Sequence, residues 1–137
     1  MKTFIKLSVS ITLLFAFGCS NNDDGNSNDG GEQSTLELLV SGRWYQESKT
    51  PGSFSTCEKS SYIEFSNETD IALHFYNDDS GPCESEGVVN ANYNLSGNTL
   101  EINVPDGTVT ANIVSISEDE LIVTAEDETV VFDKTEG

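Results

Sequence analysis

The sequence predicts an all-β domain in which eight antiparallel strands follow one another as a meander and close into a barrel. Three observations carry this prediction. Apolar and polar residues alternate with a period of two over most of residues 43–132, which is typical of half-buried strands. Short turn signals separate the alternating segments. No connection has room for a crossover helix, so neighbouring strands must be antiparallel. A two-sheet β-sandwich is the alternative architecture.

The folded domain is expected to span residues 34–137, a length that suits one domain. It begins with Ser34, which can cap a short helical turn from Thr35 to Val40 before Gly42 ends it. Eight strands follow, at residues 43–49, 62–65, 71–76, 88–95, 100–104, 109–116, 121–123 and 130–132.

Two local signals refine the meander. Pro105-Asp106-Gly107 is a strong hairpin signal between the fifth and sixth strands. Val114 and Ile116 have the opposite parity to the apolar residues before them, and a bulge near Ile113–Val114 would restore the alternation. The residues then expected to face inward are Trp44, Ile63, Phe65, Ile71, Leu73, Phe75, Val89, Ala91, Tyr93, Leu95, Leu100, Ile102, Val104, Val109, Ala111, Ile113, Leu121, Val123, Val130 and Phe132.

Residues 1–18 are interpreted as a signal peptide. Lys2 and Lys6 form a positive start, and the apolar run from Leu7 to Phe17 is too short to span a bilayer. A small residue and then Cys19 end the run, which resembles a bacterial lipoprotein signal. That resemblance implies that Cys19 is lipidated and anchors the mature chain in a membrane. An ordinary secretory signal followed by a chance cysteine is the alternative.

Residues 19–33 contain almost only polar residues and are expected to form a disordered acidic tether. Asp23 and Asp24 resemble the export tag of Bacteroidota lipoproteins, which implies the outer membrane and its cell-surface side. The alternative is a plain spacer with the protein on the periplasmic face. All 24 acidic residues follow Cys19 but only four of the six basic ones do, so the mature formal charge is −20. Such a charge excludes nucleic acid as a partner.

The three cysteines are an odd number, and lipid on Cys19 would leave Cys57 and Cys83 as a pair. A disulfide is the expected fate of that pair in an oxidising compartment. A metal pair and a thiol nucleophile remain as alternatives. Metal needs further ligands, and His74 is the only histidine. No metal site, cofactor or catalytic residue is therefore predicted, and His74 is expected on the outer face of a strand.

Gly42 and Trp44 on the first strand, followed by an eight-strand meander, resemble the Gly-x-Trp motif of lipocalins. Together with the lipoprotein start, the polar tether and the cysteine pair, they are similar to the lipocalin-like domains of Bacteroidota lipoproteins. The arginine that lipocalins carry near the last strand is absent. The resemblance implies that Trp44 packs across one end of the barrel in a structural role.

Two functions are compatible with these expectations, and neither is enzymatic. The first is a lipid-anchored module that binds a small apolar ligand in the open end of the barrel. The second is an interaction or structural lipoprotein with a filled barrel, whose Asn-rich outer face (Asn90, Asn92, Asn94) and long loop from Asn77 to Gly87 contact a protein or glycan. An apolar cavity of about 300 Å³ or more would favour the first.

Overall fold

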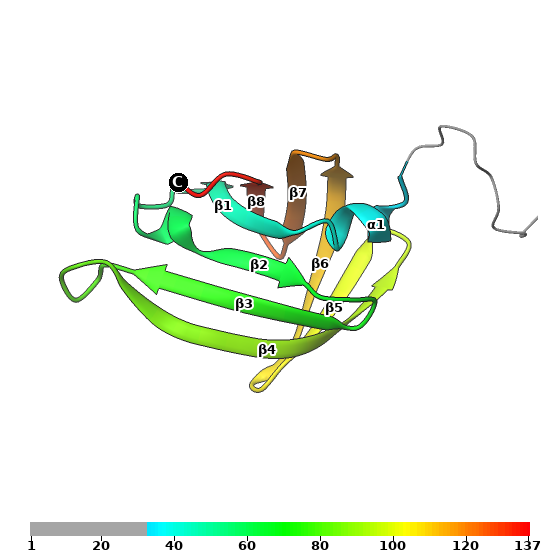
Figure 1. The fold of residues 1–137 in the computed structure, drawn as a ribbon, viewed down its shortest axis with the longest axis horizontal. Coiled ribbons are helices and arrows are strands. Elements are labelled where there is room, and N and C mark those ends of the chain that lie inside the picture. Colours follow the sequence, from blue (N-terminus) through cyan, green and yellow to red (C-terminus); the bar gives the residue numbers. More distant parts are fainter. Residues whose placement is uncertain (1–32) are drawn as a thin grey trace, which may run out of the picture. The chain divides into compact units, whose positions relative to one another are not determined.

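The computed structural model describes residues 33–137. The predicted signal peptide, Cys19, Asp23 and Asp24 lie outside the described residues. The described part is one short helix followed by eight strands and a single 3-10 turn (Figure 1). In chain order the elements are α1 (Thr35–Leu39), β1 (Arg43–Thr50), η1 (Glu58–Ser60), β2 (Tyr62–Phe65), β3 (Asp70–Asn77), β4 (Glu84–Ser96), β5 (Thr99–Val104), β6 (Gly107–Ile116), β7 (Glu120–Ala125) and β8 (Glu128–Asp133).

The helix α1 forms where the sequence predicts it. The Ser34 side chain accepts a hydrogen bond from the Glu37 amide at 3.2 Å, and the Ser34 amide donates one to the Glu37 carboxylate at 2.7 Å. This reciprocal capping box satisfies two amides that a helix start leaves without a partner. Leu38 and Leu39 on the last turn are buried, so the helix contributes to the core as well as preceding the barrel.

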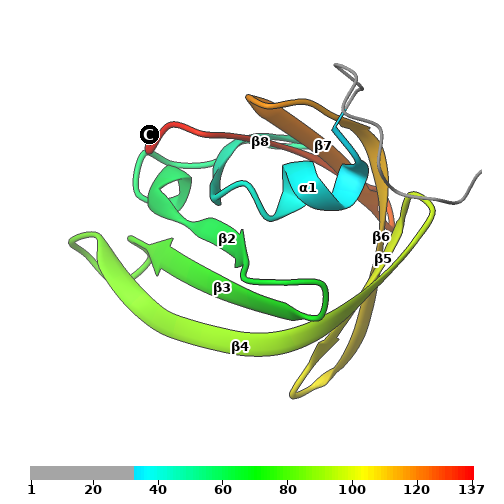
Figure 2. The same ribbon diagram turned by 45° about the vertical axis from the view of Figure 1, so that its right-hand side comes forward.

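The eight strands form a closed barrel in which each strand pairs with the next and β1 also pairs with β8. Every pairing is antiparallel. In the closing pair Gln46 lies opposite Phe132, and on its other side β1 sets Trp44 opposite Ile63. Closure removes free strand edges, which would otherwise invite pairing with other chains. The predicted meander barrel is confirmed, and the two-sheet sandwich is not the architecture (Figure 2).

Two local signals also have the expected outcome. Val104 pairs with Gly107, so Pro105 and Asp106 form the two-residue turn between β5 and β6. In the β6–β7 ladder the register shifts between Ile113 and Ser115, and the bulge residue between them is exposed. The bulge returns Ile116 to the interior side, where it packs against the core.

The prediction of a long loop from Asn77 to Gly87 is wrong, because β4 begins within this segment and shortens the loop. β3 continues to Asn77, β4 begins at Glu84, and only residues 78–83 connect them. The ladder passes a bulge where Tyr76 pairs with Ser85 instead of Glu86. The extended ends of the two strands project past the core and have no apolar face to bury. Their residues are mostly polar, so the alternation of apolar residues did not predict them as strand. Backbone pairing alone continues there.

The fully packed core lies at one end of the barrel, which we call the closed end. It is the end where odd-numbered strands begin and even-numbered strands finish. Its buried residues come from α1 and all eight strands: Leu39, Trp44, Phe65, Ile71, Tyr93, Leu100, Ala111, Ile113, Leu121 and Phe132. Every residue predicted to face inward belongs to this core, packs against it or lines the cavity described below.

Candidate functional site

The closed end is organised around Trp44, which has no exposed surface. Its indole Nε1–H donates a hydrogen bond of 2.9 Å to the backbone carbonyl of Leu39, at the end of α1. This bond satisfies both a buried indole and a helix carbonyl without an intrahelical partner. Gly42, between them, has a φ of +133°, a conformation that favours glycine. The Gly-x-Trp segment thus joins the helix to the first strand, and Trp44 does not line the cavity.

Lys134, directly after β8, covers the Trp44 ring. Its Nζ lies 3.3 Å from the ring centroid, and it donates a hydrogen bond of 2.9 Å to the Ser41 hydroxyl. Partial burial lowers the pKa of Lys134, and the nearby Asp119 opposes that shift. The sequence pattern did not predict this contact, because the lipocalin resemblance points to an arginine near the last strand. A lysine next to the last strand was the available signal, since any cation can interact with the ring.

The opposite end of the barrel holds an apolar cavity of about 430 Å³. We call this end the mouth. Four consecutive strands, β3 to β6, contribute to the cavity wall. The lining residues are Leu73, Phe75, Val89, Ile102, Val104, Pro105, Asp106 and Val109. All but Asp106 are apolar, and the volume of the cavity exceeds the value of about 300 Å³ at which small-molecule pockets typically begin.

Solvent reaches this cavity from the mouth. Phe75 and Val109 belong to the inward-facing set, yet they are 36 % and 46 % exposed. Interior positions at the closed end are exposed by only a few per cent, as for Ile71 and Leu100. Inward-facing apolar residues are thus exposed at the mouth and buried at the closed end. The barrel therefore has the form of a cup that opens at the mouth. Keeping apolar side chains in contact with water costs about 25 cal/mol per Å², a cost that an apolar ligand would remove.

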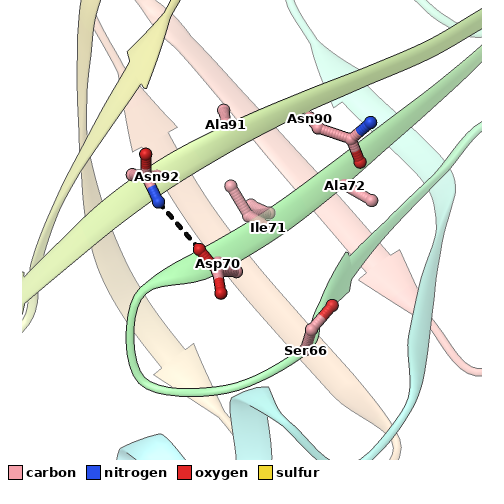
Figure 3. A pocket seen from close by; sticks show the side chains of 7 residues that line it. All are labelled: Ser66, Asp70, Ile71, Ala72, Asn90, Ala91 and Asn92. Carbon is pink, nitrogen blue, oxygen red and sulfur yellow. Dashed lines mark hydrogen bonds between the residues drawn. The ribbon is translucent and has the colours of Figure 1, made fainter.

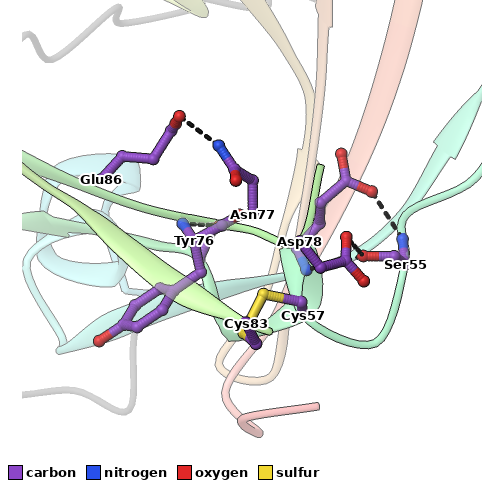
Figure 4. Close-up of a disulfide and its surroundings, with 9 residues drawn as sticks. Ser55, Cys57, Tyr76, Asn77, Asp78, Cys83 and Glu86 are labelled. Carbon is purple, nitrogen blue, oxygen red and sulfur yellow. Dashed lines mark hydrogen bonds between the residues drawn. A yellow bond between two sulfur atoms is a disulfide. The ribbon is translucent and has the colours of Figure 1, made fainter. Parts of the chain in front are cut away.

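A disulfide joins two loops at the mouth, as predicted (Figure 4). Cys57, in the β1–β2 connection, is bonded to Cys83 at the end of the β3–β4 connection, with α-carbons 5.5 Å apart. The same loops are tied by a 3.1 Å hydrogen bond from the Ser55 hydroxyl to Asp78. Lys49, near the end of β1, places its Nζ 4.7 Å from the ring centroid of Phe54 in the β1–β2 connection. The rim is therefore ordered by covalent and polar contacts.

A second hollow lies on the outer face of β3 and β4, and it is polar (Figure 3). Its volume is about 260 Å³, and its polar side chains include Ser66, Asp70, Asn90 and Asn92. Asn92 Nδ2 donates a 2.7 Å hydrogen bond to Asp70. Two members of the predicted asparagine ladder, Asn90 and Asn92, thus meet in one groove, while Asn94 does not line it.

His74 lies on the outer face in a row of aromatic side chains. Its ring stacks on Tyr62, with centroids 4.2 Å apart, and Tyr62 in turn contacts Tyr45. Arg43 lies over the Tyr62 ring at 4.5 Å. Within residues 33–137, no group of three or more His, Cys, Asp or Glu side chains could hold a metal ion. The same residues include no helix long and apolar enough to cross a membrane.

Comparison with known proteins identifies the family of this chain. The family model of the lipocalin-like domain matches residues 40–123, well over half of the chain. The chain belongs to the lipocalin-like domain family. The matched segment runs from the end of α1 into β7 and so contains the Gly-x-Trp segment, both cysteines of the disulfide and the whole cavity wall.

Two solved structures resemble this lipocalin-like chain. A lipocalin-like protein from Bacteroides uniformis is 16 % identical with a TM-score of 0.55, covering 70 % of this chain and 98 % of its own. An uncharacterized protein from Bacteroides eggerthii is 14 % identical with a TM-score of 0.54, covering 70 % and 99 %. Both sources agree with the Bacteroidota resemblance. A search of curated proteins gave no match.

Proposed function

We propose that this lipocalin-like protein binds a small apolar molecule in the cup at its mouth, as a binding protein and not as an enzyme. The observation that carries the proposal is the apolar cavity of about 430 Å³, whose inward-facing walls are partly exposed. A volume between about 300 and 1,000 Å³, lined mainly by apolar side chains with few polar groups, is typical of small-molecule sites.

The test is uptake of the neutral apolar fluorophore N-phenyl-1-naphthylamine, measured by its emission as protein is added. Val109 and Val114 offer a matched pair, because both are exposed valines on β6 but only Val109 lines the cavity. Val109→Trp should fill the cup and weaken binding at least about ten-fold, a change of about 1.4 kcal/mol. Val114→Trp should leave binding unchanged. Absence of uptake by the wild type, or equal loss in both variants, would contradict the proposal.

The second part of the proposal is that lipid on Cys19 holds this cup at the outer membrane, with the domain on the cell surface. The lipoprotein-like start of the chain and its acidic tether support it. Labelling cells with a radiolabelled fatty acid should mark the wild type and fail to mark Cys19→Ala. Equal labelling of both would remove the anchor.

The surface orientation has a separate test. Protease added to intact cells should degrade the wild-type protein, and Asp23→Ala/Asp24→Ala should protect it by leaving it on the inner side of the membrane. A wild type that is already protected would make residues 19–33 a spacer only and place the protein on the periplasmic face.

The outer groove favours a second function, contact with a protein or glycan. Its amide and carboxylate groups can donate to and accept from hydroxyl groups, and it lies outside the cup. Amide chemical-shift changes on titration with neutral oligosaccharides should then cluster at Asn90 and Asn92, and Asn90→Ala should weaken them. Shifts confined to cup residues would rule this function out for the glycans tested.

A further inference from the structure

The connections at the mouth carry a concentration of carboxylates. In a meander alternate turns lie at the same end, so the β3–β4, β5–β6 and β7–β8 connections share the mouth with the β1–β2 connection. The acidic residues in or next to the first three of these connections are all exposed: Asp78, Asp79, Glu84, Asp106, Glu126, Asp127 and Glu128. Asp106 is itself part of the cavity wall.

The basic residues of residues 33–137 do not offset this charge. Lys49 lies near the mouth, but Glu58 is 4.0 Å from its Nζ and the Phe54 ring covers it. Lys59 pairs with Glu47 at 3.1 Å. The other two belong to the closed end, where Arg43 pairs with Glu64 and Lys134 covers Trp44. A ligand entering the cup therefore meets negative charge, with no unpaired cation beside it among residues 33–137.

We propose that the cup accepts apolar molecules whose polar end is positively charged or neutral and rejects those that end in a carboxylate. This inference rests on the proposed apolar-ligand function and specifies the charge that the cup tolerates. The cavity is the binding site, and the carboxylates around it determine which ligands enter. An apolar wall of low dielectric strengthens the field that surface charges create in a concave site. A fatty-acid carboxylate held at the mouth would lie next to Asp106, and an ammonium group there would gain an ion pair.

The experiment compares three molecules with the same ten-carbon chain, decylamine, decanol and decanoate, as competitors of the neutral fluorophore at pH 7. All three have the same apolar body, so their differences report the end group. At low salt we expect decylamine to bind at least about ten-fold more tightly than decanoate, with the affinity of decanol between the two. In 0.5 M NaCl the ratio should fall towards one, because salt screens exposed charges.

Charge variants assign the effect to the mouth. Asp106→Asn should lower the decylamine-to-decanoate ratio about three-fold, and the binding of uncharged decanol to the same variant reports any change in the cup itself. The control is Glu118→Gln in the β6–β7 turn, which removes the same charge at the closed end and should leave the ratio unchanged.

The outcomes separate the two proposals. If neither the fluorophore nor any ten-carbon molecule binds, the apolar-ligand function itself is wrong. If all bind and decanoate binds as tightly as decylamine, the function stands and the charge preference is overturned. A preference that Glu118→Gln reduces as much as Asp106→Asn would also overturn it, because the effect would then come from net charge.

Discussion

At the scale of single residues, Trp44 makes the contacts that hold the closed end together. It joins the end of α1 through the Leu39 carbonyl and packs beneath Lys134. Trp44→Phe should lower the free energy of unfolding by about 2 kcal/mol, through lost volume and an unpaired carbonyl. Urea denaturation measures it. Tyr45→Phe, the next residue, lies at the half-buried outer face and should cost about 0.5 kcal/mol or less. Equal losses in both variants would contradict this role.

Tyr93 makes the stability of the closed end sensitive to high pH. Its hydroxyl donates a 2.6 Å hydrogen bond to the Asn67 carbonyl, and its ring meets Phe65 edge to face. Burial raises the pKa of Tyr93 above its usual 10.0, and the charges of Glu68 and Asp70 raise it further. Because the folded state holds this proton more tightly, its contribution is complete below pH 10 and is lost as pH rises through the folded pKa.

Tyr93→Phe tests that linkage. At pH 8 the variant should be less stable by about 1 kcal/mol, the usual contribution of one hydrogen bond. Between pH 9 and 11 its free energy of unfolding should fall less steeply than that of the wild type. Tyr76→Phe, a tyrosine on β3, controls for general effects of alkali. Parallel curves for wild type and Tyr93→Phe would contradict the assignment.

At the scale of elements, the disulfide restrains the two connections at the mouth. It closes a segment with a sequence separation of 26, for which the chain-entropy model gives about 3.5 kcal/mol. Cys57→Ala/Cys83→Ala should therefore lower the free energy of unfolding by about that amount in urea. Free-thiol titration provides the companion measurement, since the folded oxidised domain should show no reactive thiol at these positions. Two reactive thiols in that state would reopen the metal and nucleophile alternatives.

The β7–β8 turn contains a residue in an unfavourable conformation. Glu126 has a φ of +53°, and it is the one non-glycine residue of residues 33–137 with a positive φ. Such a backbone costs an ordinary side chain about 1 kcal/mol, a cost that glycine avoids. Glu126→Gly should raise the melting temperature by a few degrees in a thermal scan. Asp127→Gly, the other turn residue, has no such strain to relieve and should not raise it.

At the scale of the whole molecule, the barrel has a packed half and a hollow half. The largest fully buried side chains, Trp44, Leu39, Ile71 and Leu121, all lie at the closed end. The mouth is lined by valine, leucine, isoleucine and one phenylalanine that leave a cavity. A barrel of eight strands can be filled or can hold one small ligand, and side-chain size decides between them. Here the tightly packed end stabilises the fold, so the other end can remain hollow.

The high negative charge of the molecule should make its stability depend on salt. Its formal net charge of −18 gives carboxylates many like-charged neighbours on a small surface. Raising NaCl from 0.02 to 0.5 M should increase the free energy of unfolding by about 1 kcal/mol or more, because screening weakens this repulsion. The same addition of salt at about pH 4, where free carboxylic acids are about half protonated, should stabilise less. Loss of stability with salt at pH 7 would contradict the argument.

Much of the fold follows from sequence, because strand alternation records which side of each residue is buried. The parity of Val114 and Ile116 predicted the β6 bulge, and Pro105-Asp106-Gly107 predicted its hairpin. The sequence signals failed where backbone hydrogen bonds, and not buried side chains, hold a strand in place. The stretch by which β4 begins earlier than expected, residues 84–87, is polar and held by backbone pairing, so no apolar pattern indicated it. The contact of Lys134 with Trp44 was missed because the lipocalin resemblance points to an arginine near the last strand, and a lysine there carries the same charge.

By itself, the sequence determined the inward-facing residues, and it predicted the class of fold, the strand order and a disulfide between Cys57 and Cys83, which the structure confirms. These depend on local pattern, turn chemistry and counting. Only the tertiary structure decided whether the interior is filled, since volume depends on how residues from four strands, such as Phe75 and Val109, meet in space. It also decided that the carboxylates of three separate turns share the mouth. Closure of the barrel brings these turns, which are far apart in the sequence, to the same end of the molecule. The periodic pattern of the sequence does not indicate how close together in space they lie.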